Sequence, residues 1–180
     1  MVARIRTSIG NEPVIAAALT IAAVGAAAIL GALVFQYGFG LQPCPLCLQQ
    51  RWPYYLTIPL ALLVALAARR QAPRRALVGG LVVIALVLLW GAGLSVYHAG
   101  VEWGWWEGPQ DCAGPVTSLG AGGNLLQQMQ KVRVVRCDEA AWRLLGLSLA
   151  GWNVLIALGL AAVAVAGVVT KRYSRKLAGK

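Results

Sequence analysis

Four long apolar stretches without a charged residue dominate the chain. They are Val14–Phe35, Trp52–Ala68, Ala76–Tyr97 and Leu144–Val169. A helix rises about 1.5 Å per residue and the hydrocarbon core of a bilayer is about 30 Å thick, so three of the stretches can span it alone. The second reaches only ~26 Å and is expected to extend back toward Cys47. The pattern predicts an all-α membrane protein, a bundle of four transmembrane helices.

The expected boundaries follow from the same pattern. We place the helices at about residues 14–35, 47–68, 76–97 and 140–169, within a single membrane domain over residues 1–180, and the two outer loops at about 36–46 and 98–139. A cleaved signal peptide is disfavoured, because the first apolar run exceeds the roughly 7–15 residues of such a segment. A water-soluble bundle is disfavoured because its helices would each need a polar stripe, and these stretches are apolar all round.

Composition and charge support this interpretation and give it an orientation. Hydrophobic residues make up 59% of the chain and charged residues 12%, about half the charged share of a soluble domain. The net charge of +10 would suggest nucleic acid, but most basic residues flank the apolar stretches. These flanking residues are Arg4, Arg6, Arg69, Arg70, Arg74, Arg75, Lys171, Arg172, Arg175, Lys176 and Lys180. The positive-inside rule then puts both termini and the turn at 69–75 in the cytoplasm, so no nucleic-acid partner is expected.

All four cysteines fall in the two loops that face outward. They are Cys44, Cys47, Cys112 and Cys137. In a bacterial-type membrane this is the oxidising side, where disulfides persist, and four cysteines allow three pairings. Covalent haem is excluded because Leu48 stands where the motif needs histidine. Zinc is disfavoured and no metal is expected, since the lone His98 does not complete a Cys/His set. Structural disulfides remain an alternative to redox chemistry.

The Cys-x-x-Cys sequence favours thiol–disulfide exchange. Its two sulfurs can close a small ring, and such motifs often lower the pKa of one thiol. Pro45 suits the first turn of a helix, and Cys47 would then lie at the positive end of that helix, which favours a thiolate. Arg51 follows one turn later on the same face, where it would stabilise the thiolate or bind a polar ligand. The alternative for Arg51 is ordinary snorkelling at the membrane interface.

The second outward loop carries the other two cysteines in different surroundings. Asp138 is expected to cap a helix that runs through Trp142 into the last span, with Cys137 just outside the cap. Cys112 lies in a Gly- and Pro-rich segment that suits an exposed sulfur open to a protein partner. Between them, residues 124–132 have the spacing of a short amphipathic helix.

Three stretches of the sequence resemble the disulfide bond formation protein B family, four-span quinone reductases of the bacterial inner membrane. They are Pro43-Cys44-Pro45-Leu46-Cys47-Leu48-Gln49-Gln50-Arg51; Tyr97-His98-Ala99-Gly100-Val101-Glu102-Trp103-Gly104-Trp105-Trp106 followed by Gly-Pro and Cys112; and Cys137-Asp138 with Trp142, Leu145-Gly146-Leu147-Ser148 and Trp152. Spans, loop order and cysteine placement agree with the family along nearly the whole chain.

This resemblance implies a thiol:quinone oxidoreductase that reoxidises a soluble periplasmic thioredoxin-like dithiol oxidase and passes the electrons to the membrane quinone pool. Cys112 and Cys137 would form the disulfide that meets the partner protein. Cys137, once released, would attack Cys44 and free Cys47 beside the quinone. Ubiquinone is the expected quinone and menaquinone the alternative.

Two further residues match the family's quinone site. Arg51 matches an arginine that supports quinone binding, and His98 corresponds to a histidine near the end of the third span. Two rival interpretations remain. One is a membrane enzyme similar to vitamin K epoxide reductase, and the other is a non-catalytic membrane scaffold held by structural disulfides.

Overall fold

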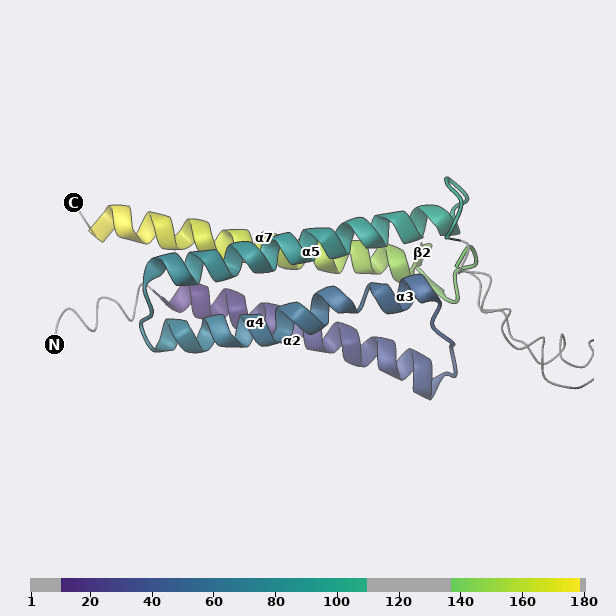
Figure 1. Ribbon diagram of the computed structural model, residues 1–180, viewed down its shortest axis with the longest axis horizontal. Helices are drawn as coiled ribbons and strands as arrows, with labels where there is room; N and C mark the ends of the chain where they lie inside the picture. The colour runs from purple at the N-terminus through teal and green to yellow at the C-terminus, as the bar shows by residue number, and fades with distance from the viewer. Residues whose placement is uncertain (1–10, 110–136, 179–180) are drawn as a thin grey trace, which may run out of the picture.

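The fold is a bundle of four membrane-length helices, as the hydrophobic pattern predicts (Figure 1). A computed structural model describes residues 11–109 and 137–178. Its helical elements are α2 (Glu12–Leu33), the π-helix η1 (Val34–Gly38), α3 (Pro45–Gln49), α4 (Trp52–Arg69), α5 (Arg74–Glu102) and α7 (Leu149–Ala178), and its strands are β1 (Arg143–Leu144) and β2 (Leu147–Ser148). Lengths and composition make this a multi-pass membrane protein.

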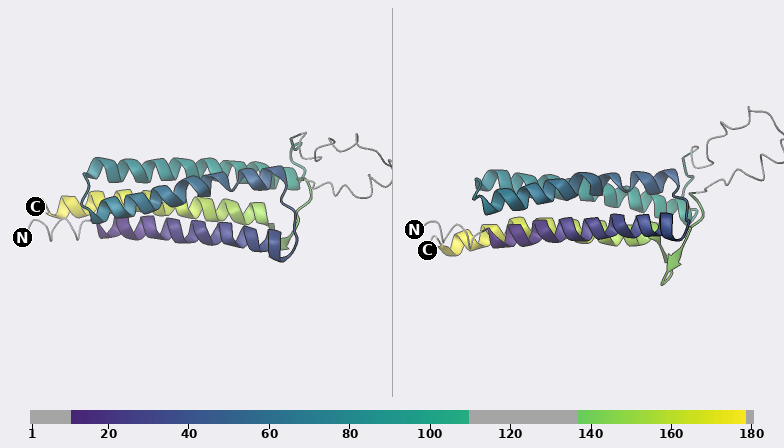
Figure 2. Two further views of the ribbon diagram at one scale, coloured as in Figure 1. Left: turned by 60° about the horizontal axis from the view of Figure 1, so that its bottom comes forward. Right: turned by 90° about the horizontal axis from the view of Figure 1, so that it is seen from below.

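The helices pack in two layers, α4 with α5 and α2 with α7 (Figure 2). Across the layers α2 packs against α4 and α5 against α7. The start of α2, the turn between α4 and α5 and the end of α7 share one end of the bundle (Figure 1). At the opposite end, called here the outer end, lie α3 and the β1–β2 hairpin. The chain therefore gathers its Cys-x-x-Cys segment and the residues after Cys137 at one end.

The second span is two helices rather than one. α3 ends at Gln49, α4 begins at Trp52, and Arg51 is the N-cap residue of α4. Pro53 lies in the first turn of α4, where its missing N–H needs no helical partner, so the sequence favours a new helix start there. Gln50 and Arg51 lie at this break between the two helices, and their side chains make tertiary contacts.

Small residues let the helices approach closely. A Cβ atom added at Gly80 would lie 2.5 Å from Cγ2 of Val64, and one added at Gly91 would lie 2.9 Å from two ring carbons of Pro53. Membrane helices gain little from the hydrophobic effect against lipid, so such close contact is a main source of their association. The Gly91–Pro53 contact also fixes α5 beside the break in the second span.

Two helix boundaries differ from the sequence prediction. α5 continues through His98 to Glu102, so the second outer loop begins five residues later than expected. The last helix begins at Leu149 and not near residue 140, and Asp138 is therefore not its N-cap residue. The intervening residues form an antiparallel hairpin whose two turn residues, Leu145 and Gly146, have φ values of 53° and 82°. Positive φ at both positions is what a type I′ hairpin turn requires, and a helix cannot pass through it.

Gly91→Ala is expected to weaken the bundle, because the added methyl group meets Pro53 in a contact that has no room for it. Overpacking of this kind costs roughly 1–3 kcal/mol of the free energy of unfolding. Gly93→Ala is the matched control: it lies on the same helix, is exposed, and its added Cβ meets nothing within 4 Å. Unfolding in mixed detergent micelles should show a loss for Gly91→Ala alone, and equal stabilities would contradict the packing role.

Candidate active site

The Cys-x-x-Cys motif sits at the outer end of the bundle with both thiols free. Cys44 is the N-cap residue of α3 and Pro45 occupies the first turn, as the sequence predicts. The two sulfur atoms lie 2.7 Å apart, against about 2.05 Å in a disulfide. Closing the disulfide therefore needs only a small movement of the side chains.

The polar surroundings favour a thiolate on Cys44, whereas the sequence argument placed it on Cys47. The hydrogen bond between the two sulfurs is the largest of the effects that lower the pKa of Cys44 to about 5, against the opposing effect of burial. His98 and the backbone N–H of Cys47, 3.2 Å from the sulfur, act in the same direction. The helix begins at Pro45 as expected, but the backbone N–H of Cys47 points back at the sulfur of the capping residue Cys44, so the positive end of the helix stabilises charge on Cys44.

Cys137 lies in the same buried cluster as this pair. It is 2% exposed, is disulfide-bonded, and packs in one buried cluster with Cys44 and Val101. The sequence separates these residues by a long loop, yet the fold brings a second redox-capable sulfur to the buried Cys44. Cys112, like the amphipathic segment 124–132, lies outside the described residues.

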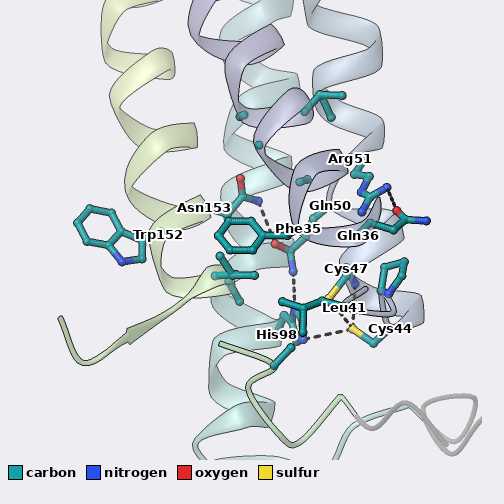
Figure 3. Close-up of a pocket in the computed structure, with 18 of the residues that line it drawn as sticks. Phe35, Gln36, Leu41, Cys44, Cys47, Gln50, Arg51, His98, Trp152 and Asn153 are labelled. Atoms are coloured by element: carbon teal, nitrogen blue, oxygen red, sulfur yellow. Dashed lines mark hydrogen bonds between the residues drawn. The ribbon is translucent and has the colours of Figure 1, made fainter. Parts of the chain in front are cut away.

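His98 contacts the dithiol directly (Figure 3). It is 3% exposed, and its Nε2 lies 3.6 Å from Cys44 Sγ. The side-chain amide of Gln50 donates to Nδ1, which leaves the ring proton on Nε2, facing the sulfur. One turn further along α5, a carboxylate oxygen of Glu102 lies 3.8 Å from the same Nε2. The sequence argument assigned His98 to the quinone; the structure places it within reach of the sulfur as well as on the cavity wall.

A buried hydrogen-bond network holds this end of the bundle together. Asn153 of α7 donates to Gln50 Oε1 at 2.9 Å and to Ser95 Oγ at 2.7 Å. Tyr54 of α4 donates to Asn153 Oδ1 at 2.6 Å. Gln50 in turn hydrogen-bonds to His98, so the network connects α4, α5 and α7 behind the cysteines. In a membrane these groups find no water, and each needs the others as partners.

Arg51 reaches across the bundle to the first span. Its Nη1 donates to Oε1 of Gln36 at 2.8 Å (Figure 3). Gln36 lies on the π-helix η1, an irregular turn of a kind that often marks functional sites. Arg51 and Gln36 both line the cavity described next, so the contact fixes the guanidinium at the cavity wall.

A cavity of about 310 Å³ joins these groups. Its outer part carries the polar side chains and its inner part is apolar. The polar lining comprises Gln36, Gln42, Cys44, Cys47, Gln50, Arg51, Tyr54, His98, Glu102, Glu139 and Asn153, and the apolar inner lining includes Ala28, Ile29, Ala32 and Ile156. Small-molecule pockets have volumes of roughly 300–1,000 Å³. The cavity therefore suits a molecule with a polar head and an apolar tail, placed beside a dithiol.

Sequence reasoning found the cysteines, Arg51 and His98 but missed their partners. Gln36, Gln50, Glu102 and Asn153 all line the cavity. A signal was available for Asn153, because a polar amide inside a membrane span is unusual and indicates a buried interaction. Nothing in the local sequence shows which residue it meets.

Several known proteins similar to the chain carry the same description. The family model for Disulfide bond formation protein DsbB matches residues 15–167. Disulfide bond formation protein B of Xanthomonas campestris pv. campestris (strain 8004) is 32% identical over 148 residues, which cover 81% of this chain and 85% of that protein. Disulfide bond formation protein B of Saccharophagus degradans is 31% identical over 143 residues, covering 76% and 82%. No solved structure matches the chain significantly.

Asn153→Leu is expected to destabilise the protein more than Tyr54→Phe. The first leaves Tyr54, Gln50 and Ser95 without a shared partner, and a buried group left unsatisfied costs roughly 1–3 kcal/mol. The second removes one hydrogen bond, worth about 0.5–1.5 kcal/mol. In a double-mutant cycle measured by unfolding in micelles, the double variant should lose less stability than the sum of the losses in the two single variants. Additive costs would show that the network does not act as a unit.

Proposed function

The chain belongs to the disulfide bond formation protein DsbB family, and we propose that within this family it reoxidises a soluble thioredoxin-like dithiol oxidase and passes the electrons to a membrane quinone. Family membership makes it a membrane oxidoreductase of disulfide bond formation. The observation that carries the finer proposal is that Cys137 shares one buried cluster with Cys44, and that Cys44 and Cys47 line a cavity between membrane helices.

The proposed exchange runs through two disulfides. Within this chain Cys44 and Cys47 are free thiols, so we assign Cys112 as the disulfide partner of Cys137. A partner thiolate attacks Cys112 Sγ, forms a mixed disulfide and releases the Cys137 thiolate. Cys137 then attacks Cys44 Sγ of an oxidised Cys44–Cys47 pair and releases Cys47.

The partner's second thiol next displaces Cys112 from the mixed disulfide, and the freed Cys112 displaces Cys44 to restore the Cys112–Cys137 bond. The partner has lost two electrons and two protons and leaves as a disulfide. Cys44 and Cys47 have gained both electrons and are the reduced pair. The presence of Cys137 and Cys44 in one buried cluster supports the middle step, because exchange requires the attacking sulfur to reach its target.

The residues around the cavity fit a quinone. A quinone has carbonyl oxygens on a flat ring and an isoprenoid tail, which match a polar outer lining and an apolar inner one. Arg51 and Gln36 would hold one oxygen, since a guanidinium donates from a fixed planar fork. When bound, the quinone supplies the oxidising power by accepting two electrons and two protons from the reduced dithiol.

The chain's own residues prepare the dithiol for this step. His98 directs its Nε2 proton at Cys44 Sγ and so stabilises negative charge there. Gln50 fixes the ring through Nδ1, and the network behind it fixes Gln50. Burial of Cys44 and His98 keeps water away from the sulfur, which strengthens these contacts. His98 thus serves the thiols as well as the cavity.

We further propose that the outer end of the bundle faces the periplasm and that the protein lies in the bacterial inner membrane. The basic turn between α4 and α5 lies at the opposite end, as the positive-inside rule requires for a cytoplasmic end. A soluble protein would then meet the cysteines from water, and a quinone would meet them from the lipid. Ubiquinone is the proposed quinone, with menaquinone as the alternative.

Purified protein should oxidise a reduced thioredoxin-like partner repeatedly only when a quinone is supplied. Parallel assays with ubiquinone and menaquinone analogues identify the preferred acceptor. Cys137→Ser leaves Cys112 as a thiol, whose thiolate should attack the disulfide of the oxidised partner, form a mixed disulfide and release the partner's second thiol. This complex should persist and run as one band without reductant, because the Cys137 thiol that would displace the partner from Cys112 is missing. Absence of turnover with every quinone would favour a structural scaffold, and a trapped complex through Cys47 would reverse the order of the two disulfides.

Arg51→Ala should impair the quinone step by about 10- to 150-fold, since a hydrogen bond to a charged group is worth roughly 1.5–3 kcal/mol. The expected signature is a raised apparent KM for quinone or slower quinone reduction, with single-turnover oxidation of the partner nearly unchanged. Arg51→Lys should recover part of the loss, because a point charge lacks the planar fork. Arg143→Ala is the matched control: it removes the same charge from an exposed site at the same end of the bundle. If Arg51→Ala blocks the single turnover instead, Arg51 serves the partner protein.

A further inference from the structure

Cys44, Cys47 and His98 together have the composition of a metal site when the two cysteines are reduced. The thiolate-forming atoms of Cys44 and Cys47 and a ring nitrogen of His98 all lie within 4.8 Å of one another. Sequence spacing argues against zinc because only one short-spaced cysteine pair is present. The fold supplies the missing third ligand. His98 lies 51 positions after Cys47 in the sequence, and α5 brings its ring next to the sulfur of Cys44.

Glu102 provides a second, independent indication. Its side chain is 5% exposed and lies one turn after His98 on α5. Oε1 is 3.8 Å from His98 Nε2, and Oε2 is buried without a hydrogen-bond partner. A buried carboxylate with an unsatisfied oxygen is costly unless it is paired or coordinates a cation. Arg51 also lines the cavity, but its Nη1 is directed to Gln36.

We propose that the reduced protein binds a thiophilic divalent ion of the zinc class through Cys44, Cys47, His98 and Glu102. Two thiolates, one imidazole and one carboxylate form a closed four-ligand set of the kind that holds Zn²⁺. Binding releases the thiol protons and moves no electrons, because Zn²⁺ has no redox chemistry.

The observed separations suit tetrahedral coordination. With Zn–S of about 2.3 Å and Zn–N of about 2.0–2.1 Å, a ligand sulfur and nitrogen lie ~3.5 Å apart and two sulfurs ~3.8 Å apart. Cys44 Sγ and His98 Nε2 are already 3.6 Å apart. The two sulfurs, now 2.7 Å apart, must separate by about 1 Å, which Cys47 can provide because it is only partly buried.

Gln50 would orient the histidine ligand. Coordination requires Nε2 without its proton, so the ring proton moves to Nδ1 and the amide of Gln50 turns over to accept it. Ligating histidines commonly donate their other N–H to such a partner. Asn153 and Ser95 can follow the reversal, because an amide and a hydroxyl each both donate and accept.

The ion and the disulfide exclude each other, since both use the same two sulfurs. Resting on the function proposed above, a bound ion would hold the dithiol reduced and out of the path to the quinone. Metal binding itself does not depend on that function, so the two can be tested separately.

Co²⁺, which reports thiolate ligation by absorption, is the probe for this site. We would titrate it into the full-length chain carrying Cys112→Ser and Cys137→Ser, reduced and freed of reductant without oxygen. One ion per chain should bind with thiolate-to-cobalt charge-transfer absorption, and Zn²⁺ should displace it. The same chain with an oxidised Cys44–Cys47 pair should not bind. Equal binding by oxidised and reduced protein would overturn the proposal.

The ligand variants sharpen the test. Glu102→Gln keeps both thiols and the imidazole and should weaken Co²⁺ binding at least tenfold, whereas Glu107→Gln, an exposed residue just beyond α5, should bind like the parent chain. Unchanged affinity in Glu102→Gln would overturn the four-ligand site. Turnover with quinone is measured on the chain that keeps all four cysteines, and Co²⁺ binding on the chain with Cys112→Ser and Cys137→Ser. Turnover in the first without cobalt–thiolate absorption in the second overturns the metal site and leaves the proposed function standing. Absorption in the second without turnover in the first supports the metal site and overturns the proposed function.

Discussion

The hydrogen bonds of Gln50 with His98, Ser95 and Asn153 hold three helices in register at the outer end of the bundle. In the apolar interior of a membrane these groups have no water to turn to, so the helices must pack in the one arrangement that satisfies them all. That arrangement sets the position of His98, and through it the surroundings of Cys44. The chemistry of the sulfurs therefore depends on polar contacts that lie behind them.

The break in the second span makes these contacts possible. Had the chain continued as one regular helix from Pro45 to Arg69, Gln50 and Arg51 would take directions fixed by the helical repeat. The restart at Trp52 instead lets Gln50 point to α5 and Arg51 to Gln36 on the first span. Pro53, in contact with Gly91, secures both the restart and the nearby packing of α5. The break in the second span thus directs Gln50 toward His98 and Arg51 toward Gln36.

The cavity joins two environments that disulfide formation must connect. Its polar end holds the free Cys44–Cys47 pair with Cys137 packed beside it, and its inner end is lined by small and branched apolar residues of α2 and α7. Sulfur exchange needs close approach of side chains, whereas a lipid-soluble acceptor needs an apolar site of about its own size. The cluster of two thiols and an imidazole, with the buried carboxylate of Glu102 one turn further along α5, is the basis of the proposed metal site.

The hydrophobic pattern by itself determined the class of the protein, because long uncharged runs can be satisfied only as membrane-spanning helices. The spacing of Cys44 and Cys47, with the motifs around them, was enough for the family. The local geometry of the motif and the tertiary structure together decided which sulfur gains the stabilising contacts, since these come from Cys47, three residues further on, and from His98 on another helix. The tertiary structure also decided the partners of Asn153 and Glu102 and the hairpin ahead of α7, where positive φ at Leu145 and Gly146 replaced the expected helix start. Periodicity reports which residues avoid water, but contacts between helices far apart in the chain depend on packing that no local pattern encodes.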